Sequence, residues 1–198
     1  MKLAAVTVAC LAATAFTFSP ARAGADGHVN FFLGQKSLDG DDWAPIDDQF
    51  EFGVVMSFGQ DDWPVHIAVD VLTSVGEKTL SDSFAGDVTF TGSTFEIDTG
   101  VRKIWKKGKV LPYIGGGIGI IGAATTVDAG FASVDAVDAT FGLWAGTGVF
   151  FRLGSNFNIG LDLRYSNAEV DLDFGNAAVA QNVSAGGFHY GLLLGFGW

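Results

Sequence analysis

The fold is indicated most clearly by the stretch Phe157–Ser166, which reads F-N-I-G-L-D-L-R-Y-S. Every second residue from Phe157 to Tyr165 is a large apolar or aromatic residue, and the residues between them are polar or glycine. Side chains along a β-strand point alternately to the two faces of the sheet. The stretch therefore predicts a strand with one apolar face and one polar face.

The same period of two recurs along the chain. In the segment 50–58, Phe50, Phe52 and Phe58 share one face, while Glu51 lies on the other. Strands of an outer-membrane barrel need about 9–11 residues to cross at a tilt. In addition to 157–166, seven further segments are predicted to be strands: 29–36, 50–58, 65–72, 95–102, 110–122, 140–152 and 187–198. The alternation is least regular in 29–36.

The connections between these segments alternate in length. Short turns are expected at Gln60–Trp63, Lys106–Lys109 and Gly154–Ser155. Outer-membrane barrels have short periplasmic turns and long extracellular loops, so this pattern places both termini on the periplasmic side. The expected long connections cover residues 38–48, 74–92, 123–137 and 168–184.

The composition agrees with a barrel in lipid. The chain is 48% hydrophobic, with 18 Phe and 5 Trp, yet after its first segment it has no apolar run of helix-spanning length. We therefore predict an all-β, eight-stranded antiparallel up-and-down transmembrane β-barrel, closed because an open edge in lipid would leave backbone groups unpaired. The rival is a soluble lipocalin-like barrel with inverted faces, whose interior would have to enclose more aromatic rings than eight strands can hold.

Residues 1–23 have the features of a secretory signal peptide. Lys2 precedes an apolar run to Phe18, and Ala21-Arg22-Ala23 forms an A-x-A cleavage site. The expected mature domain, 24–198, lacks the single cysteine, Cys10, and so has no disulfide or lipid anchor. Loss of Lys2 and Arg22 leaves 9 cations against 22 anions, so the net charge moves from −11 to −13. This acidity argues against binding nucleic acid.

Three stretches resemble the eight-stranded outer-membrane barrels of the OmpA/OmpX/OmpW type: Pro112–Gly119, Asn158–Tyr165 and Tyr190–Trp198. The resemblance implies location in the outer membrane, a monomer, and contact with outer-membrane lipids and lipopolysaccharide. It also implies recognition by the barrel-assembly machinery through a C-terminal aromatic residue and alternate apolar residues before it. The residues that match this assembly signal are Tyr190, Leu194, Phe196 and Trp198, although the glycines around them differ from the usual pattern.

The polar faces predict a set of charged side chains inside the barrel. Buried charges of both signs must be paired or hydrated, so a structural ion-pair ladder is expected, with a gate for small ions as the alternative. A general base built from His66, Asp70 and His189 is a further alternative, but barrel enzymes that act on lipids place such groups on the outer face. The predicted lumen residues are Glu51, His66, Asp70, Glu96, Asp98, Arg102, Asp162, Arg164 and His189. His28, near the mature amino terminus, is expected to be solvated.

Glycines on two strands should leave parts of the inner wall bare. Trp144 and Phe150 are expected to lie across this backbone as aromatic cover, while the functional alternative is a narrow pocket for a small apolar molecule. The glycines are Gly115, Gly117, Gly119, Gly187, Gly191 and Gly195.

The four long connections are acidic, which predicts solvated loops or weak binding of divalent cations. We expect no cofactor, no resident metal and no catalytic site. The expected function is therefore a structural or surface-interaction role, with a small channel or carrier as the alternative and a lipid-modifying enzyme as the third. The loop carboxylates are Asp39, Asp41, Asp42, Asp47, Asp48, Glu77, Asp82, Asp87, Asp128, Asp135, Asp138, Glu169, Asp171 and Asp173.

Overall fold

The computed structural model describes residues 24–82, 86–106, 108–128, 133–173 and 179–198. The predicted signal peptide, 1–23, and Cys10 lie outside the described residues. Among the described residues, no helix is both long enough and apolar enough to cross a membrane. The elements are β1 (Ala25–Ser37), α1 (Gly40–Trp43), β2 (Asp48–Gln60), β3 (His66–Asp82), β4 (Gly86–Ile104), β5 (Val110–Asp128), β6 (Ser133–Leu153), β7 (Phe157–Asn167), β8 (Glu169–Asp173), β9 (Val179–Ser184) and β10 (Gly187–Gly197).

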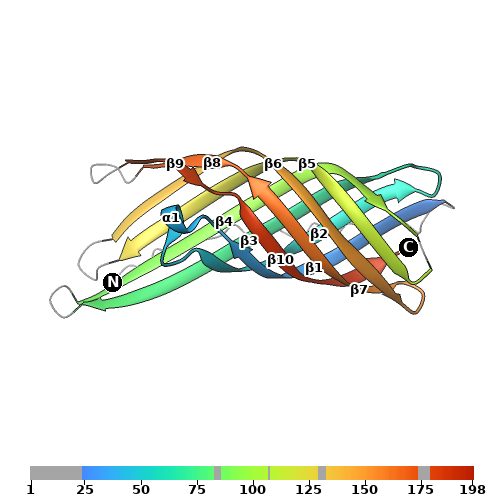
Figure 1. Cartoon of the computed structure of the whole chain (residues 1–198), viewed down its shortest axis with the longest axis horizontal. Coiled ribbons are helices and arrows are strands. Elements are labelled where there is room, and N and C mark those ends of the chain that lie inside the picture. Colours follow the sequence, from blue (N-terminus) through green and yellow to red (C-terminus); the bar gives the residue numbers. More distant parts are fainter. Residues whose placement is uncertain (1–23, 83–85, 107, 129–132, 174–178) are drawn as a thin grey trace.

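Eight of these strands form a closed antiparallel barrel in the order β1-β10-β7-β6-β5-β4-β3-β2 (Figure 1). β1 closes the barrel by pairing with the last strand, with Val29 opposite Phe196. Each of the eight predicted segments falls on one of these strands, with Val65 and Trp198 one residue beyond the strand bounds, so the predicted fold is confirmed. We call the end that carries the tight turns and the C-terminus the short-turn end, on the right of Figure 1, and the opposite end the long-loop end.

Two of the expected long loops are in fact mostly strand. β3 and β4 remain paired from Gly76↔Gly92 to Asp82↔Gly86, and β5 and β6 remain paired from Gly122↔Ala139 to Asp128↔Ser133. The period-two signal fades there because these hairpins run past the ends of β2 and β7 and no longer need an apolar outer face. The other two connections hold α1 and a separate β8–β9 hairpin.

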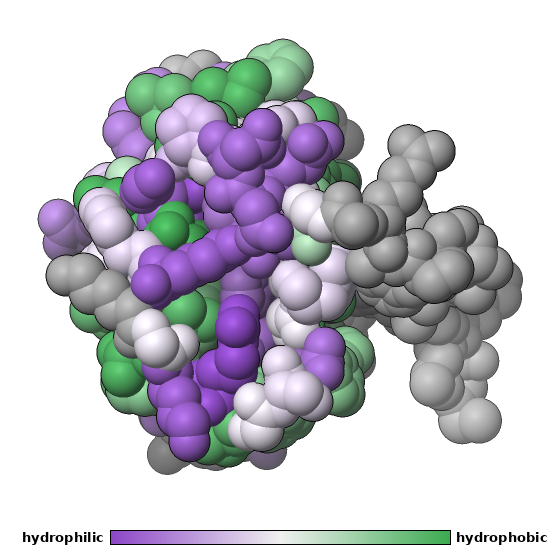
Figure 2. Space-filling model, turned by 90° about the vertical axis from the view of Figure 1, so that its right-hand side faces the viewer, coloured by the Kyte–Doolittle hydropathy of each residue, from purple (hydrophilic) through white to green (hydrophobic). Residues whose placement is uncertain are grey.

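The alternation places the apolar rows on the outside of the barrel. Phe157, Leu161 and Tyr165 of β7 are exposed, while Asp162 and Arg164 between them are buried in the lumen. Figure 2 views the short-turn end and shows hydrophilic residues across its middle and hydrophobic residues around its edge. The barrel thus has an apolar outer surface and a polar interior, as in proteins that close a sheet within lipid.

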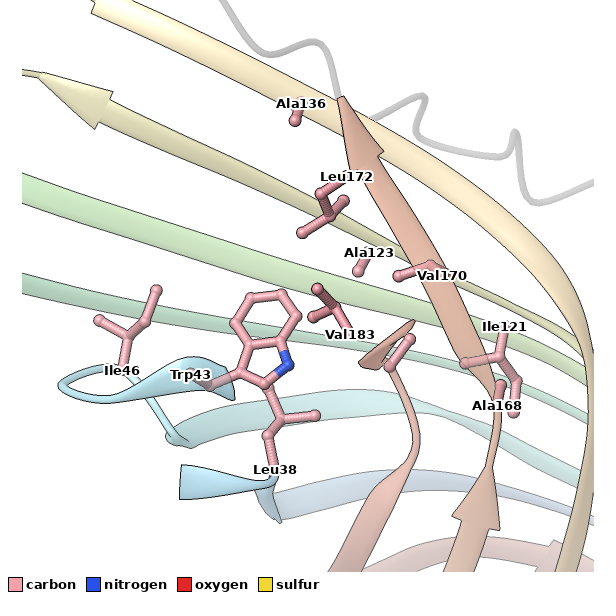
Figure 3. Close-up of a cluster of buried hydrophobic side chains, with 11 residues drawn as sticks. Leu38, Trp43, Ile46, Ile121, Ala123, Ala136, Ala168, Val170, Leu172 and Val183 are labelled. Atoms are coloured by element: carbon pink, nitrogen blue, oxygen red, sulfur yellow. The ribbon is translucent and has the colours of Figure 1, made fainter. Parts of the chain in front are cut away.

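Two apolar clusters lie inside the barrel, one toward each end. Near the long-loop end, side chains from α1 and from the β8–β9 hairpin pack against the inner wall of β5 and β6; Figure 3 shows Trp43, Val183 and Leu172 directed toward the same region. Toward the short-turn end, a second cluster surrounds Phe150. Its members are Phe32, Val55, Leu72, Ile104, Leu111, Tyr113, Phe150 and Leu193.

Candidate functional site: the side chains that fill the lumen

The centre of the lumen holds five charged side chains, which we call the central ionic cluster: Asp70, Asp98, Arg102, Asp162 and Arg164. Arg164 of β7 reaches across the barrel to Asp70 of β3, on the opposite wall, with Nη2 2.5 Å from Oδ2. Its Nη1 donates to Asp98 Oδ2 at 2.8 Å. Arg102 donates to the same Asp70 oxygen at 2.8 Å. The Asp70 carboxylate therefore connects β3 with β7, which lies four places away in the barrel order.

Aromatic rings surround these guanidinium groups. The Trp144 ring lies 4.7 Å from Arg164 Cζ and 5.8 Å from Arg102 Cζ, measured to the ring centroid. Tyr113 lies 5.2 Å from Arg102 Cζ and donates its hydroxyl hydrogen to Asp162. Cation–π contacts of this kind favour a desolvated arginine. Every charge of the central ionic cluster thus has a charged or aromatic neighbour, as a buried ion requires.

A second network lies closer to the long-loop end; we call it the upper network, and it consists of Lys36, Glu51, Glu96, Ser166 and His189. Lys36 Nζ donates to Glu96 Oε1 at 2.6 Å, and it also bonds the carbonyl oxygen of Ala185 and the hydroxyl of Thr94. His189 Nδ1 lies 2.8 Å from Glu51 Oε1. Lys36 is not among the lumen residues predicted from the sequence, because the alternation of its strand is weak.

Within the upper network, Ser166, His189 and Glu51 have the order of a nucleophile, base and acid. Ser166 Oγ lies 2.9 Å from His189 Nε2, and the other ring nitrogen contacts Glu51. However, Ser166 Oγ also donates to Glu96 Oε1 at 2.8 Å, and all these side chains are fully buried. A serine that is fully buried and whose hydrogen is held by a carboxylate is poorly placed to attack a substrate.

The structure separates the three residues of the alternative general-base hypothesis. His66 contacts Asp26, His189 contacts Glu51, and Asp70 binds two arginines. None of the three therefore bonds another of them.

An aromatic layer formed by His28, Tyr113 and Phe150 lies on the short-turn side of the central ionic cluster. The Phe150 ring stacks on His28 at 5.0 Å and on Tyr113 at 4.7 Å between centroids. His28 is buried and its Nδ1 lies 3.1 Å from Asn158 Nδ2, so the expectation that it is solvated was wrong. β1 begins at Ala25, earlier than the sequence pattern suggested, and carries His28 into the lumen.

The long-loop end is closed by α1 and the β8–β9 hairpin, which together we call the cap. Trp43 Nε1 donates to the carbonyl oxygen of Ser184 at 2.6 Å, and Asp42 Oδ2 accepts from the Ser184 amide at 2.8 Å. On the other side, Asp138 of β6 accepts from the Asp171 amide at 2.9 Å. The bonds to Ser184 thus join α1 to the β8–β9 hairpin, and the bond to Asp138 joins the hairpin to the barrel wall.

Side chains occupy the space above the predicted glycine wall. Trp144 lies over Gly115, as expected, and a Cβ at Gly115 would be 3.2 Å from that ring. Phe150 lies beside Gly160 of β7, where a Cβ would be 3.2 Å from its ring, and it is not among the atoms nearest to the predicted glycines. At Gly191 a Cβ would be 2.7 Å from the Phe32 ring. Gly117, Gly119, Gly187 and Gly195 likewise face backbone or side-chain atoms of neighbouring strands within van der Waals reach.

The expected assembly-signal residues follow the outer face. Tyr190, Leu194 and Phe196 are exposed on β10. Trp198 follows the strand, and its ring occupies the space next to Gly27, where a side chain would collide with it. The loop acids, by contrast, are dispersed: within the described residues, no three His, Cys, Asp or Glu side chains gather as they would around a metal ion.

Known structures with this barrel come from several bacteria. The structure of Ail of Yersinia pestis, solved in complex with the heparin analogue sucrose octasulfate, superposes on this chain with a TM-score of 0.58 at 13% sequence identity. The superposition covers 88% of this chain and 99% of Ail. OprG of Pseudomonas aeruginosa gives 0.57 at 14% identity, covering 88% and 96%. Neisserial surface protein A gives 0.52 at 18% identity, covering 86% and 96%.

These identities establish the fold and nothing finer. No protein-family model matches the chain, and no curated protein sequence matches it. The closed order of strands and the three superpositions agree on one conclusion: the chain has the fold of the eight-stranded outer-membrane β-barrels of the OmpA/OmpX/OmpW type.

Proposed function

We propose that this chain is a non-enzymatic integral protein of the bacterial outer membrane whose barrel is a closed scaffold. Its short-turn end and both termini face the periplasm, and its acidic long-loop end faces outward. The apolar outer surface supports insertion in lipid, since water-exposed surfaces rarely carry such continuous apolar patches. The alternation of tight turns and long connections supports the orientation.

The observation that carries this proposal is the filling of the lumen at successive levels. The cap, the upper network, the central ionic cluster and the aromatic layer follow one another along the barrel. Arg164 and Asp70 join opposite walls, so a permeating ion would have to break a buried pair. Breaking such a pair costs about 3–5 kcal/mol, which favours a closed scaffold over an open channel.

The surface-interaction role is supported by what the scaffold displays. β3, β4, β5 and β6 continue past their neighbours as paired hairpins at the long-loop end (Figure 1). Acidic side chains such as Asp41, Asp87 and Asp173 are exposed there. Outer-membrane lipids and lipopolysaccharide would surround the barrel. The barrel-assembly machinery would recognise the C-terminal signal formed by Tyr190, Leu194, Phe196 and Trp198.

Planar-bilayer recording tests the closed scaffold. The refolded mature chain should insert and show no single-channel steps above the empty-bilayer background, while a known porin recorded in the same bilayer serves as the control. Membrane location is tested separately: the chain should stay in the membrane fraction through carbonate and high salt and be released by detergent. Reproducible conductance steps would contradict the scaffold, and release by carbonate would contradict the location.

A second candidate, passage of small ions, is favoured by one specific observation. Several buried polar atoms along the lumen have no hydrogen-bond partner among the residues that the structure describes, including both side-chain amide atoms of Asn30 and Asp98 Oδ1. Water commonly satisfies such atoms, and a continuous file of water would conduct. In that case Arg164→Ala should change the size or ion selectivity of the steps seen in the bilayer.

A further inference from the structure

A cavity of about 310 Å³ opens at the short-turn end, between the β2–β3 turn and the end of β4. The side chains that matter for its chemistry are Asp61, Trp63, His66, Lys103, Trp105 and Lys106. The volume falls within the range of about 300–1,000 Å³ typical of small-molecule sites. Unlike the filled lumen, this cavity is accessible from outside.

The cavity combines charges of both signs. Lys106 Nζ lies 2.7 Å from Asp61 Oδ1 and 3.0 Å from Asp26 Oδ2, while Lys103 Nζ donates to the carbonyl oxygen of Pro64 at 2.6 Å. Partial burial opposes the charge of Lys106, but the hydrogen bonds to Asp61 and Asp26 outweigh it and raise the pKa of the ammonium group. Lys106 is therefore cationic at neutral pH, although the chain as a whole is strongly acidic.

One buried polar atom at this cavity lacks a partner. The His66 side chain is 5% exposed, and its Nε2 contacts the Asp26 carboxylate. Its Nδ1 has no hydrogen-bond partner within the described part of the chain. Because Nε2 faces a carboxylate, it carries the hydrogen, so Nδ1 can donate only when the ring is an imidazolium. Nδ1 is itself buried, so His66 forms part of the cavity wall without offering this atom to a ligand.

Two tryptophans at the cavity, Trp63 and Trp105, indicate its level in the bilayer. Trp63 and Trp105 are 41% and 42% exposed and stand where the apolar outer face ends. Tryptophan rings favour the headgroup level of a bilayer. Their faces also attract organic cations. A ligand held here would therefore lie among lipid headgroups of the leaflet next to the short-turn end.

We propose that this cavity binds the headgroup of a zwitterionic phospholipid of the phosphoethanolamine type. The phosphate would accept hydrogen bonds from Lys103 and Lys106, while the ammonium group would pair with Asp61 beside the Trp63 ring. Asp61 decides between ligand classes, because its carboxylate would repel a purely anionic headgroup but attract an ammonium. The proposal rests on the proposed membrane location and adds a specific lipid contact to it.

The test uses the refolded mature chain in detergent micelles, with the tryptophan indole N–H groups observed by NMR. The chain has five tryptophans, assigned by single Trp→Phe variants. Short-chain phosphatidylethanolamine should shift the Trp63 and Trp105 signals in a saturable way and leave Trp43 and Trp144, inside the barrel, unchanged. Short-chain phosphatidylglycerol tests an anionic headgroup, and free phosphoethanolamine tests whether the lipid chains are needed.

Matched variants assign the contacts. Lys103→Gln should weaken binding of phosphatidylethanolamine by about two- to tenfold, as expected for an exposed charge contact, while Lys78→Gln at the long-loop end serves as the control and should change nothing. Asp61→Asn should weaken phosphatidylethanolamine in the same range and leave phosphatidylglycerol unaffected or tighter. Equal shifts with both lipids, or no effect of Asp61→Asn, would overturn the proposal. Carbonate extraction reports on membrane location independently, so failure of one proposal is not mistaken for failure of the other.

Discussion

The central ionic cluster predicts a large and specific effect of Asp70→Ala. Asp70 accepts hydrogen bonds from Arg102 and Arg164, and its other oxygen accepts from the backbone amide of Met56. The substitution changes the balance of the cluster from three carboxylates and two guanidinium groups to two of each. The cluster then has equal numbers of positive and negative charges. We nevertheless expect the barrel to lose stability, because of where the remaining hydrogen-bond partners lie.

The magnitude follows from what each arginine retains. Arg164 keeps Asp98 at 2.8 Å and Asp162 at 3.9 Å. Arg102 keeps hydrogen bonds to the Met56 carbonyl oxygen at 3.1 Å and Ser57 Oγ at 2.8 Å and its contacts with the Tyr113 and Trp144 rings, none of which carries a negative charge. It becomes a buried cation without a carboxylate, for which about 3–5 kcal/mol of unfolding free energy is expected to be lost. Replacing the stranded cation as well, in Asp70→Ala/Arg102→Met, should recover at least half of this loss.

Urea unfolding of the refolded chain in lipid vesicles measures these free energies, with tryptophan fluorescence and gel mobility as two probes of the same transition. Asp61→Ala provides the control, because the side chains of the Lys106–Asp61 pair are 41% and 69% exposed and such pairs contribute about 0–1 kcal/mol. Strictly additive losses in the double variant would refute the reasoning, since they would mean that Arg102 does not depend on Asp70.

Three further predictions concern other parts of the chain. Ser166 should not react with a fluorophosphonate probe in the folded protein, since its hydroxyl is buried and bonded; labelling that is lost in Ser166→Ala would contradict the non-enzymatic proposal. Trp43→Ala should speed hydrogen exchange in the cap while the urea midpoint of the barrel changes little, whereas an equal loss at both sites would show that the cap is not a separate unit. Hydrogen bonds from the backbone amides of Asp171 and Ala139 lower the pKa of Asp138 below its ordinary 3.8. The Asp138 carboxylate therefore stabilises the cap above pH 3.8, and this stabilisation is lost as the pH falls through the lowered pKa. The NMR chemical shift of the Asp171 amide should titrate with a midpoint below pH 3.8, and a midpoint at or above 3.8 would contradict the contact.

Much of the architecture was predictable because it depends on a local rule. In a strand the side chain of every second residue meets the same environment, so Phe157, Leu161 and Tyr165 already separate the outer face from the lumen. The rule is weaker where both faces are mixed. β1 alternates poorly, and for that reason Lys36 and His28 were not recognised as lumen residues.

The rule also fails where a strand has no apolar surface to cover. The upper parts of β3–β6 lack the pattern because they project beyond the barrel, and only their mutual pairing shows that they are strands. Similarly, the sequence offered no sign that residues 40–43 and the β8–β9 hairpin would fold back as a cap, since the cap depends on contacts such as Trp43 with Ser184, far apart in the chain.

Where the alternation is regular, as in β7, the sequence alone predicts which side chains enter the lumen, because the direction of a side chain along a strand depends only on whether its position is odd or even. It could not determine which of them meet. That Arg164 reaches Asp70 and not Glu51, that Ser166 lies against His189, and that Trp144 covers Gly115 all depend on the stagger between strands and on the diameter at which the sheet closes. Those are properties of eight strands together, and no single stretch of residues specifies them.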